Sequence, residues 1–215
     1  MKPPRAQQTV FIVDDDPAIR KSLQLLIEMS GLPVRTFPSA ASFLETYQPG
    51  DAGCLILDIR MPGISGLDLQ QELIRRSFDI PIIVLTGYGD VPSAIRALKS
   101  GAVEFLEKPV EDDVLLNHVR RALALEAQHR SQRTEQGLVR ERIERLTPRE
   151  LEVLRLVIDG LSSKEIGYRL HVTCKTVEAH RLRIMKKMEV EGVAELVRLV
   201  VGVLSRDPGR SASDS

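Results

Sequence analysis

Residues 54 to 58 read Cys54-Leu55-Ile56-Leu57-Asp58, four apolar residues that end in a carboxylate. A segment that is hydrophobic along its whole length is typical of a central strand in a parallel sheet, because both faces of such a strand are buried. Ligands of open α/β sheets bind beyond the carboxyl ends of the strands. We therefore expect Asp58 to lie at the C-terminal edge of a sheet and to take part in the chemistry there.

Apolar segments alternate with amphipathic helical segments from Thr9 to about Ala127. The five expected strands are Val10–Val13, Pro33–Thr36, Cys54–Leu57, Ile80–Leu85 and Val103–Leu106. The helices between them are expected to begin at the caps Asp16 (with Pro17 next), Ser39, Gly66, Asp90 and Asp112, with Gly31 and Gly101 as left-handed helix ends. Connections this short allow only right-handed crossovers, so the pattern predicts an α/β fold with a doubly wound five-stranded parallel sheet.

The chain changes character after this segment. From Gln128 to Gln136 there is no large apolar residue, so we expect a helical linker, and one long helix or a broken one both fit. Four short helices follow. Capping boxes start the first two at Thr147 and Ser162, Thr173 opens the third, and Gly192 starts the fourth. The expected domains are 9–125, a linker at 126–143, a small all-α four-helix domain at 144–209 and a disordered tail at 210–215.

Charge is divided unevenly between the two parts. Residues 1 to 127 hold 13 basic and 17 acidic residues, and residues 128 to 215 hold 17 basic and 13 acidic ones. Seven Lys and Arg but only two Glu lie between residues 164 and 187, which predicts a polyanionic partner for this segment. We expect neither export nor membrane insertion, and Cys54 and Cys174 form no C-x-x-C pair. We expect a cytoplasmic protein with reduced thiols.

Charged residues follow several of the expected strands. Asp14 and Asp15 come after the first strand and Asp58 after the third, which neighbours it in this winding. Carboxylates at one sheet edge repel each other unless a hard cation such as Mg²⁺ bridges them. Lys108 follows the last strand, and Thr86 ends the fourth. An ammonium beside an acidic, metal-holding cleft suits the neutralisation of a phosphoryl group during transfer.

Each of these residues also has a simpler interpretation. An acidic triplet such as Asp14-Asp15-Asp16 can be a solvated cap at a helix N-terminus, and we assign Asp16 to that role. A single lysine such as Lys108 is more often a surface residue than a catalytic one. Only the joint placement at four strand ends is specific.

Two groups of motifs carry a resemblance to a known family. The first group is Val13-Asp14-Asp15-Asp16, Leu57-Asp58-Ile59-Arg60-Met61-Pro62-Gly63, Leu85-Thr86-Gly87 and Phe105-Leu106-Glu107-Lys108-Pro109, and the second is Lys164-Glu165-Ile166 and Thr176-Val177-Glu178-Ala179-His180-Arg181. With these motifs, residues 9 to about 125 resemble the receiver domain of two-component response regulators, and the whole chain resembles the NarL/FixJ type with a LuxR-type helix-turn-helix. The receiver resemblance rests on the first group. It implies a flavodoxin-like fold and a sensor histidine kinase that phosphorylates Asp58. It also implies that Asp15, Asp58 and the carbonyl of Arg60 hold Mg²⁺, that Asp14 helps through water, and that Lys108 pairs with the phosphoryl oxygens.

The resemblance further implies a conformational switch. In the family, the hydroxyl at the position of Thr86 moves toward the phosphoryl group, and an aromatic at the position of Phe105 turns inward behind it. This remodels the helix expected from Asp90 to Ser100. The Lys108–Pro109 peptide bond is expected to be cis.

The segment from Thr173 to Glu189 predicts a DNA-binding helix. At 100° per residue, Val177, Arg181, Ile184 and Met188 share an inward face, and the opposite face carries Lys175, Ala179, Leu182, Arg183 and Lys186. A narrow cationic stripe of this kind suits a major groove, although basic helix faces are often merely solvated. The LuxR-type resemblance adds Lys164, Thr176 and Glu178 to the expected DNA contacts and leaves Arg181 mainly structural.

These observations predict a transcription factor, not an enzyme. Phosphorylation of Asp58 is expected to make the face from Asp90 to Leu106 dimerise, so that two recognition helices reach promoter DNA, with RNA polymerase as a candidate further partner. Two alternatives stay open: a DNA binder that ignores phosphorylation, and a phosphohydrolase. Hydrolases of the haloacid dehalogenase type need an acid two residues after the nucleophile, where this chain has Arg60.

Overall fold

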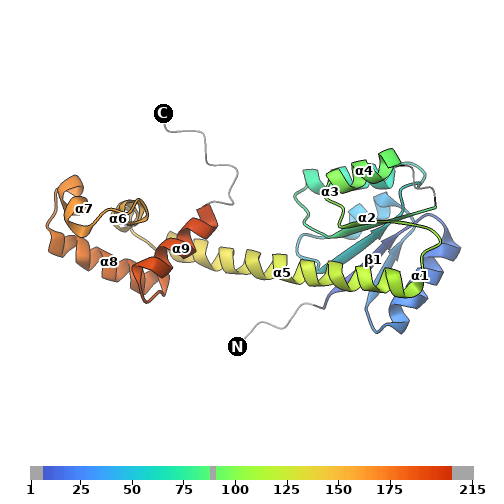
Figure 1. Ribbon diagram of the computed structural model, residues 1–215, viewed down its shortest axis with the longest axis horizontal. Coiled ribbons are helices and arrows are strands. Elements are labelled where there is room, and N and C mark those ends of the chain that lie inside the picture. Colours follow the sequence, from blue (N-terminus) through green and yellow to red (C-terminus); the bar gives the residue numbers. More distant parts are fainter. Residues whose placement is uncertain (1–6, 88–90, 205–215) are drawn as a thin grey trace. The chain divides into compact units, whose positions relative to one another are not determined.

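The computed structural model describes residues 7–87 and 91–204. The chain divides into two compact units, and the boundary along the chain lies between Arg130 and Ser131. The first unit holds a five-stranded sheet with helices on both faces (Figure 1). The strands are β1 (Thr9–Val13), β2 (Val34–Phe37), β3 (Gly53–Leu57), β4 (Ile82–Thr86) and β5 (Glu104–Glu107). They are all parallel, in the order β2-β1-β3-β4-β5. The doubly wound parallel sheet expected from the sequence is confirmed.

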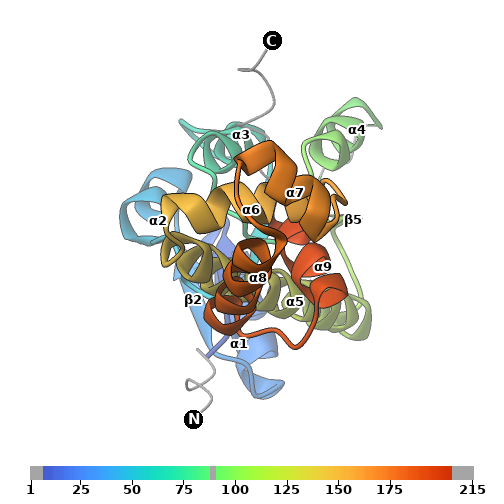
Figure 2. The same ribbon diagram turned by 90° about the vertical axis from the view of Figure 1, so that its left-hand side faces the viewer.

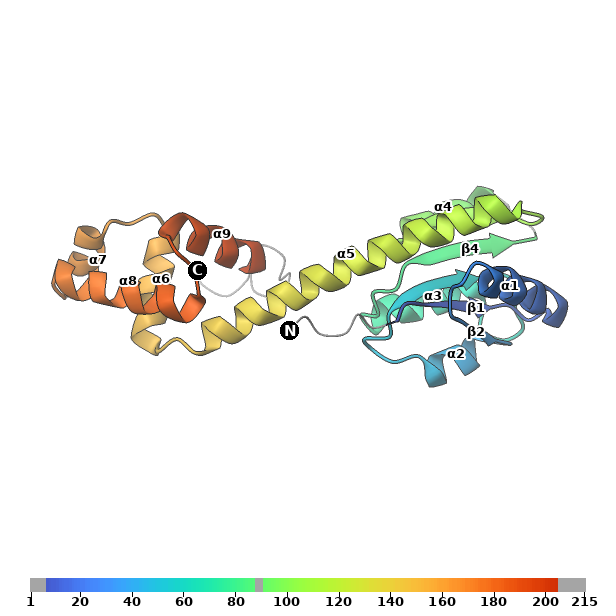
Figure 3. The ribbon, with the colours of Figure 1, turned by 90° about the horizontal axis from the view of Figure 1, so that it is seen from below.

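Each face of the sheet has its own hydrophobic core, because successive side chains of a strand point to opposite faces. Helix α1 (Pro17–Met29) and the first part of α5 (Asp112–Glu144) cover one face, as Figure 3 shows. Helices α2 (Ala40–Thr46), α3 (Gly66–Arg75) and α4 (Val91–Lys99) cover the other. Burial on both faces explains why β3 and β4 are apolar at nearly every position.

Three strands begin later than expected: β5 starts at Glu104 and not at Val103, and the other two differences involve proline. We expected strands to start at Pro33 and Ile80, whereas β2 starts at Val34 and β4 at Ile82, directly after Pro81. Proline has no N–H to donate to a neighbouring strand. The carbonyls of Pro33 and Pro81 still accept hydrogen bonds from the neighbouring strands, so only the strand bounds change.

Two of the five helix caps expected in the first unit are confirmed. Asp16 and Ser39 are the N-caps of α1 and α2. The expectation for α3 was wrong by one residue, because the hydroxyl of Ser65 caps it by accepting the N–H of Asp68, and Gly66 is the first helical residue. Asp112 likewise lies inside the first turn of α5, not before it. The cap expected at Asp90 lies outside the described residues.

The second unit contains the four short helices expected from the sequence (Figure 2). They are α6 (Pro148–Ile158), α7 (Ser163–Leu170), α8 (Cys174–Met188) and α9 (Val193–Leu204). Both capping boxes are present, with Thr147 paired to Glu150 and Ser162 paired to Glu165. Side chains from all four helices and from Val139 form one core.

The polar stretch from Gln128 to Gln136 lies within α5, which runs without a break from Asp112 to Glu144. One long helix and a broken helix both fitted the sequence, and the structure has the continuous one. Val119 and Ala122 of this helix are buried in the first unit, and Val139 is buried in the second. Among the described residues, no helix combines the length and the apolar character needed to cross a bilayer. The tail expected at 210–215 lies outside them.

Candidate functional site

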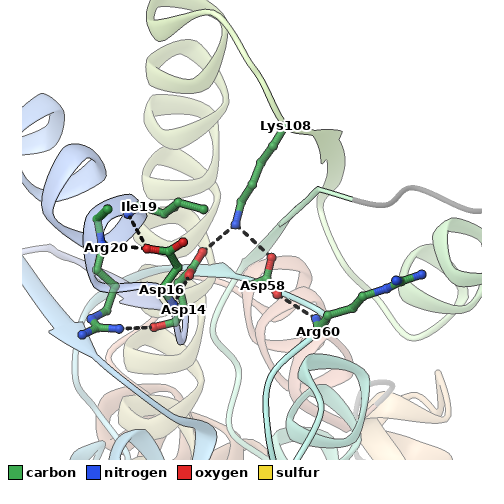
Figure 4. A network of polar contacts seen from close by, with 8 residues as sticks. Asp14, Asp16, Ile19, Arg20, Asp58, Arg60 and Lys108 are labelled. Atoms are coloured by element: carbon green, nitrogen blue, oxygen red, sulfur yellow. Dashed lines mark hydrogen bonds and ion pairs between the residues drawn. The ribbon is translucent and has the colours of Figure 1, made fainter.

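Three strand ends meet at the C-terminal edge of the sheet. Val13 of β1 is in register with Leu57 of β3, so the residues that follow them, Asp14 and Asp58, lie side by side. Lys108, which follows β5, reaches between the two carboxylates, as Figure 4 shows. Its Nζ donates to Asp14 Oδ2 at 2.6 Å and to Asp58 Oδ1 at 2.9 Å. Residues 50 and 94 positions apart in the sequence thus form one cluster.

The second oxygen of each carboxylate is held by backbone. Asp14 Oδ1 accepts the N–H of Asp16 at 2.9 Å, and Asp58 Oδ2 accepts the N–H of Arg60 at 2.7 Å. Asp14 is only 2% exposed and Asp58 7% exposed, so neither carboxylate can rotate freely into solvent. Asp16 is the cap of α1 and accepts the N–H groups of Ala18 and Ile19. The acidic triplet therefore combines a helix cap with a buried carboxylate.

Burial dominates the electrostatics of this cluster. It raises the pKa of Asp58 above the ordinary aspartate value, with a further increase from Asp14, and the hydrogen bond and charge of Lys108 only partly oppose it. Burial lowers the pKa of Lys108, but the two carboxylates more than offset that effect, and its pKa is raised overall. Lys108 therefore keeps its proton, and the raised pKa makes the Asp58 carboxylate more basic than an ordinary aspartate.

Asp15 lies at the open side of this cluster. Its side chain is exposed and lines a cavity of about 900 Å³ together with Arg60, Met61 and Ser65. Within residues 7–87 and 91–204, no three His, Cys, Asp or Glu side chains are already arranged around a common metal position. The nearby donors are nevertheless all oxygens, from the carboxylates of Asp15 and Asp58 and the carbonyl of Arg60, and this chemistry fits Mg²⁺.

The two expected switch residues lie on neighbouring strands. Thr86 is the last residue of β4 and is 1% exposed, and its carbonyl accepts the N–H of Lys108 at 2.8 Å. Phe105 of β5 is partly buried against the core formed with α2, α3 and α4. The peptide bond between Lys108 and Pro109 is cis, as expected.

Arg20 belongs to this cluster, although the sequence did not indicate it. Its Nη1 donates to the carbonyl of Asp14 at 2.7 Å from the first turns of α1, and Figure 4 shows the guanidinium on that side. The contact holds the backbone that carries Asp14 and Asp15. No local pattern predicts it, because it depends on how α1 packs against the end of β1.

Helix α8 presents the two faces expected from its sequence. Val177, Ile184 and Met188 are fully buried, and Arg181 is partly buried and donates to Ser163 Oγ at 3.1 Å. Leu182 is 66% exposed on the other face. The remaining residues expected to contact DNA are also exposed, apart from Ala179, which is partly buried: Lys164, Lys175, Thr176, Glu178, Arg183 and Lys186.

Comparison with known protein families agrees with both parts of the chain. The model of the response regulator receiver domain matches residues 10–120, and the model of the bacterial regulatory proteins of the luxR family matches residues 144–200. This chain is a response regulator of the NarL/FixJ type.

Relatives of this response regulator match along most of their length. The transcriptional regulatory protein FixJ of Azorhizobium caulinodans is 44% identical over 200 residues, which cover 92% of this chain and 95% of that protein. The response regulator protein TodT of Pseudomonas putida is 42% identical over 190 residues, which cover 88% and 84%. The solved structure of the response regulator StyR has a TM-score of 0.80 and 45% identity, and covers 91% of this chain and 98% of that one.

Membership of this family affects one alternative that the sequence left open, a phosphohydrolase. Response regulators of this type are transcriptional regulators and not a class of catalytic enzymes. Their receiver domains typically bind Mg²⁺ at the acidic site. The phosphohydrolase alternative therefore loses its support, and the role of phosphorylation in this chain becomes the question to test.

Proposed function

We propose that a sensor histidine kinase transfers a phosphoryl group to Asp58 and that this modification controls the binding of promoter DNA. The observation that carries the proposal is the bridge from Lys108 Nζ to Asp14 Oδ2 and Asp58 Oδ1, at 2.6 and 2.9 Å. This bridge places one buried, basic carboxylate beside a fixed cation at the edge of the sheet.

The proposed transfer forms one bond to phosphorus and breaks one. A carboxylate oxygen of Asp58 attacks the phosphorus of a phosphohistidine, and the bond between phosphorus and the imidazole nitrogen breaks. The electron pair of that bond stays on the imidazole nitrogen, and the ring, which carries a proton on its other nitrogen, leaves as neutral imidazole. Lys108 Nζ then pairs with a phosphoryl oxygen in place of Asp58 Oδ1, so that its charge neutralises the incoming group.

Asp15, Asp58 and the carbonyl of Arg60 are the residues we propose for Mg²⁺, with Asp14 acting through water. When bound, the ion would supply positive charge next to the phosphoryl oxygens. Asp15 is suited to this role because its carboxylate is exposed on the cavity beside Arg60. The hydrogen bond of the Arg60 N–H to Asp58 Oδ2 keeps the Arg60 backbone close to the acceptor.

Phosphorylation is proposed to act through Thr86 and Phe105 on α4 and β5. Two apolar side chains of α4 support a contact surface there, since Ile95 is 46% and Leu98 48% exposed. A second copy of the chain is the proposed partner of this face, as expected from the sequence. The part of that face at Asp90 lies outside the described residues.

The second unit is proposed to bind DNA through α8, which would enter the major groove as the second helix of a helix-turn-helix. Lys164, Lys175, Thr176, Arg183 and Lys186 are proposed for phosphate or base contacts, with Glu178, Ala179 and Leu182 nearest the bases. A dimer would present two such helices. The proposed domain bounds remain 9–125 and 144–209, RNA polymerase remains a candidate partner, and chromosomal DNA as the target places the protein in the cytoplasm.

Phosphotransfer read together with DNA affinity tests this proposal. Wild type, Asp58→Asn and Asp113→Asn would be treated with acetyl phosphate and Mg²⁺, and binding to selected operator DNA would then be measured. Asp113 is an exposed acid in the first turn of α5 and serves as the matched control. Wild type and Asp113→Asn are expected to take up label and bind DNA more tightly, and Asp58→Asn to do neither. Equal DNA affinity before and after labelling would instead favour a DNA binder that ignores phosphorylation.

A further inference from the structure

Gln70 of α3 is a fully buried polar residue that joins α3 to the end of α4. Its Nε2 donates two hydrogen bonds of 2.9 Å, one to the carbonyl of Ala97 and one to the carbonyl of Ser100. Gln70 is 0% exposed. Because both neighbours are acceptors, the NH₂ group must face them, and only a side chain with two donors on one atom can bind both.

The other end of the same amide has no such partner. Gln70 Oε1 is buried and accepts no hydrogen bond from the residues that the structure describes. A methionine would fill a similar volume without burying an unpaired oxygen. The same substitution would also remove the two hydrogen bonds to the carbonyls of Ala97 and Ser100, so this glutamine joins α3 to α4 and leaves one buried oxygen without a partner among the described residues.

The first turn of α3 rests directly on the backbone of the phosphoacceptor. The N–H of Gly66 donates to the carbonyl of Ile59 at 2.9 Å. A Cβ atom at Gly66 would lie 2.1 Å from the carbonyl oxygen of Asp58, so only glycine allows this approach. A shift of the loop after Asp58 must therefore be passed to α3.

The last turn of α4 is the other end of this connection. Ala97 is fully buried against the core, while Ile95 and Leu98 on the same helix are exposed. Gln70 ties the carbonyl of Ala97 and that of Ser100 to α3. A continuous chain of contacts thus runs from Asp58 through Gly66 and Gln70 to the exposed side of α4, and it does not use Thr86 or Phe105.

We propose that Gln70 is a positioning residue that couples phosphorylation of Asp58 to the position of α4, and so to dimerisation. The inference rests on the proposed function, because it assumes that phosphorylated Asp58 promotes dimerisation through α4. Gln70 acts as a clamp: when the start of α3 moves with the loop after Asp58, the end of α4 moves with it. Without the clamp, phosphorylation still occurs but changes the dimerisation constant less.

Gln70→Met tests this with a matched control, Gln71→Met. Gln71 is the next residue of α3 and is exposed, so the same substitution there leaves the clamp intact. Dimer dissociation constants would be measured by analytical ultracentrifugation with and without acetyl phosphate and Mg²⁺, at equal stoichiometry of label on Asp58. The readout is the dimer dissociation constant of the unphosphorylated protein divided by that of the phosphorylated protein. A uniform loss of stability does not change this ratio.

We expect Gln70→Met to be labelled at the wild-type level and its ratio to fall by at least about threefold, within the roughly 2- to 30-fold effects of residues along a coupling network. Gln71→Met should keep the wild-type ratio. A Gln70→Met ratio equal to that of wild type would overturn the role of Gln70 alone. A wild-type protein that takes up label without dimerising would overturn the proposed function together with this inference.

If Gln70→Met does not fold, a second variant and a measurement on the wild type still test the proposal. Gln70→Asn keeps the amide but is one methylene too short to reach both carbonyls, and it should lower the ratio in the same direction. In the wild type, hydrogen exchange of the amides from Ala97 to Ala102 should change on phosphorylation. Unchanged exchange in that segment, beside normal dimerisation, would contradict the proposal.

Discussion

The ammonium of Lys108 donates a 2.9 Å hydrogen bond to the carboxylate of Asp58, 50 residues earlier in the chain. The same nitrogen binds Asp14 at 2.6 Å, so one cation is shared by two buried acids. The parallel sheet makes this arrangement possible, because it brings the ends of β1, β3 and β5 to one edge.

Lys108→Met should destabilise the first unit in buffer without divalent cations. It would leave two buried carboxylates without their shared cation, and removing one partner of a buried ion pair costs roughly 3 kcal/mol. Thermal unfolding with and without Mg²⁺ would check this, and the ion should stabilise the variant more than the wild type. Lys99→Met, at an exposed lysine, is the control. An unchanged Tm for Lys108→Met would show that the bridge contributes nothing to folding.

Gly66→Ala should disturb the phosphoacceptor loop. Its Cβ would lie 2.1 Å from the carbonyl oxygen of Asp58, and overpacking of this kind costs about 1–3 kcal/mol. Labelling by acetyl phosphate should slow as well. Gly137→Ala is the control, because that helical glycine has no atoms near the added Cβ and the change should stabilise α5 by about 0.5–1 kcal/mol. Wild-type labelling and Tm for Gly66→Ala would contradict the close packing.

Two adjacent lysines of α8 should separate DNA binding from stability. Lys186 is exposed, whereas Lys187 Nζ binds Glu150 Oε2 at 2.6 Å and the carbonyl of Arg145 at 3.1 Å. Lys186→Ala should weaken DNA binding and lower the slope of log Kd against log salt concentration by about one, with Tm unchanged. Lys187→Ala should lower Tm and leave the salt dependence of DNA binding unchanged. A reversed pattern would mean that the DNA-binding face of α8 has been assigned wrongly.

Glu150 should make the second unit sensitive to acid. Burial by itself raises the pKa of this carboxyl, but Lys187 and the hydrogen bonds of Thr147 outweigh it, and the pKa is lowered overall. A group with a lowered folded pKa contributes stability above its ordinary value of 4.5 and loses it as pH falls through the folded value. The stability difference between wild type and Glu150→Gln should therefore be present at pH 7 and shrink below about pH 4.5.

The control for that experiment is Glu152→Gln, at an exposed position two residues further along α6. Its unfolding free energy should follow that of the wild type across the acid range. A Glu150→Gln difference that stays constant from pH 7 to pH 3 would exclude titration of Glu150 as its cause.

Much of the fold can be predicted because it depends on local patterns. The apolar run Cys54–Leu57 followed by Asp58 predicts both a central strand and its reactive end, and Thr147 and Ser162 start helices with capping boxes. The cap of α3 was missed although Ser65 stands three residues before Asp68, which is a recognisable signal. No such signal predicts that α5 continues without a break through its polar segment, since the sequence of that segment also fits a broken helix.

The contacts that the sequence did not indicate are tertiary. Arg20 reaches the carbonyl of Asp14 only because α1 packs back toward the end of β1, and Gln70 reaches Ala97 only because α3 lies beside α4. Neither residue has a spacing or a neighbour that distinguishes it from an ordinary surface position of an amphipathic helix. Contacts of this kind depend on how helices are placed over a sheet.

The most direct test of the account is the site of phosphorylation itself. Wild type and Asp58→Asn would be incubated with acetyl phosphate, with Mg²⁺ and with a chelator instead, and the label would be located by mass spectrometry of peptides. The account predicts one phosphoryl group on Asp58 of the wild type, only when Mg²⁺ is present, and none on Asp58→Asn. A label on any other residue of the wild type, or equal labelling of the two proteins, would contradict it.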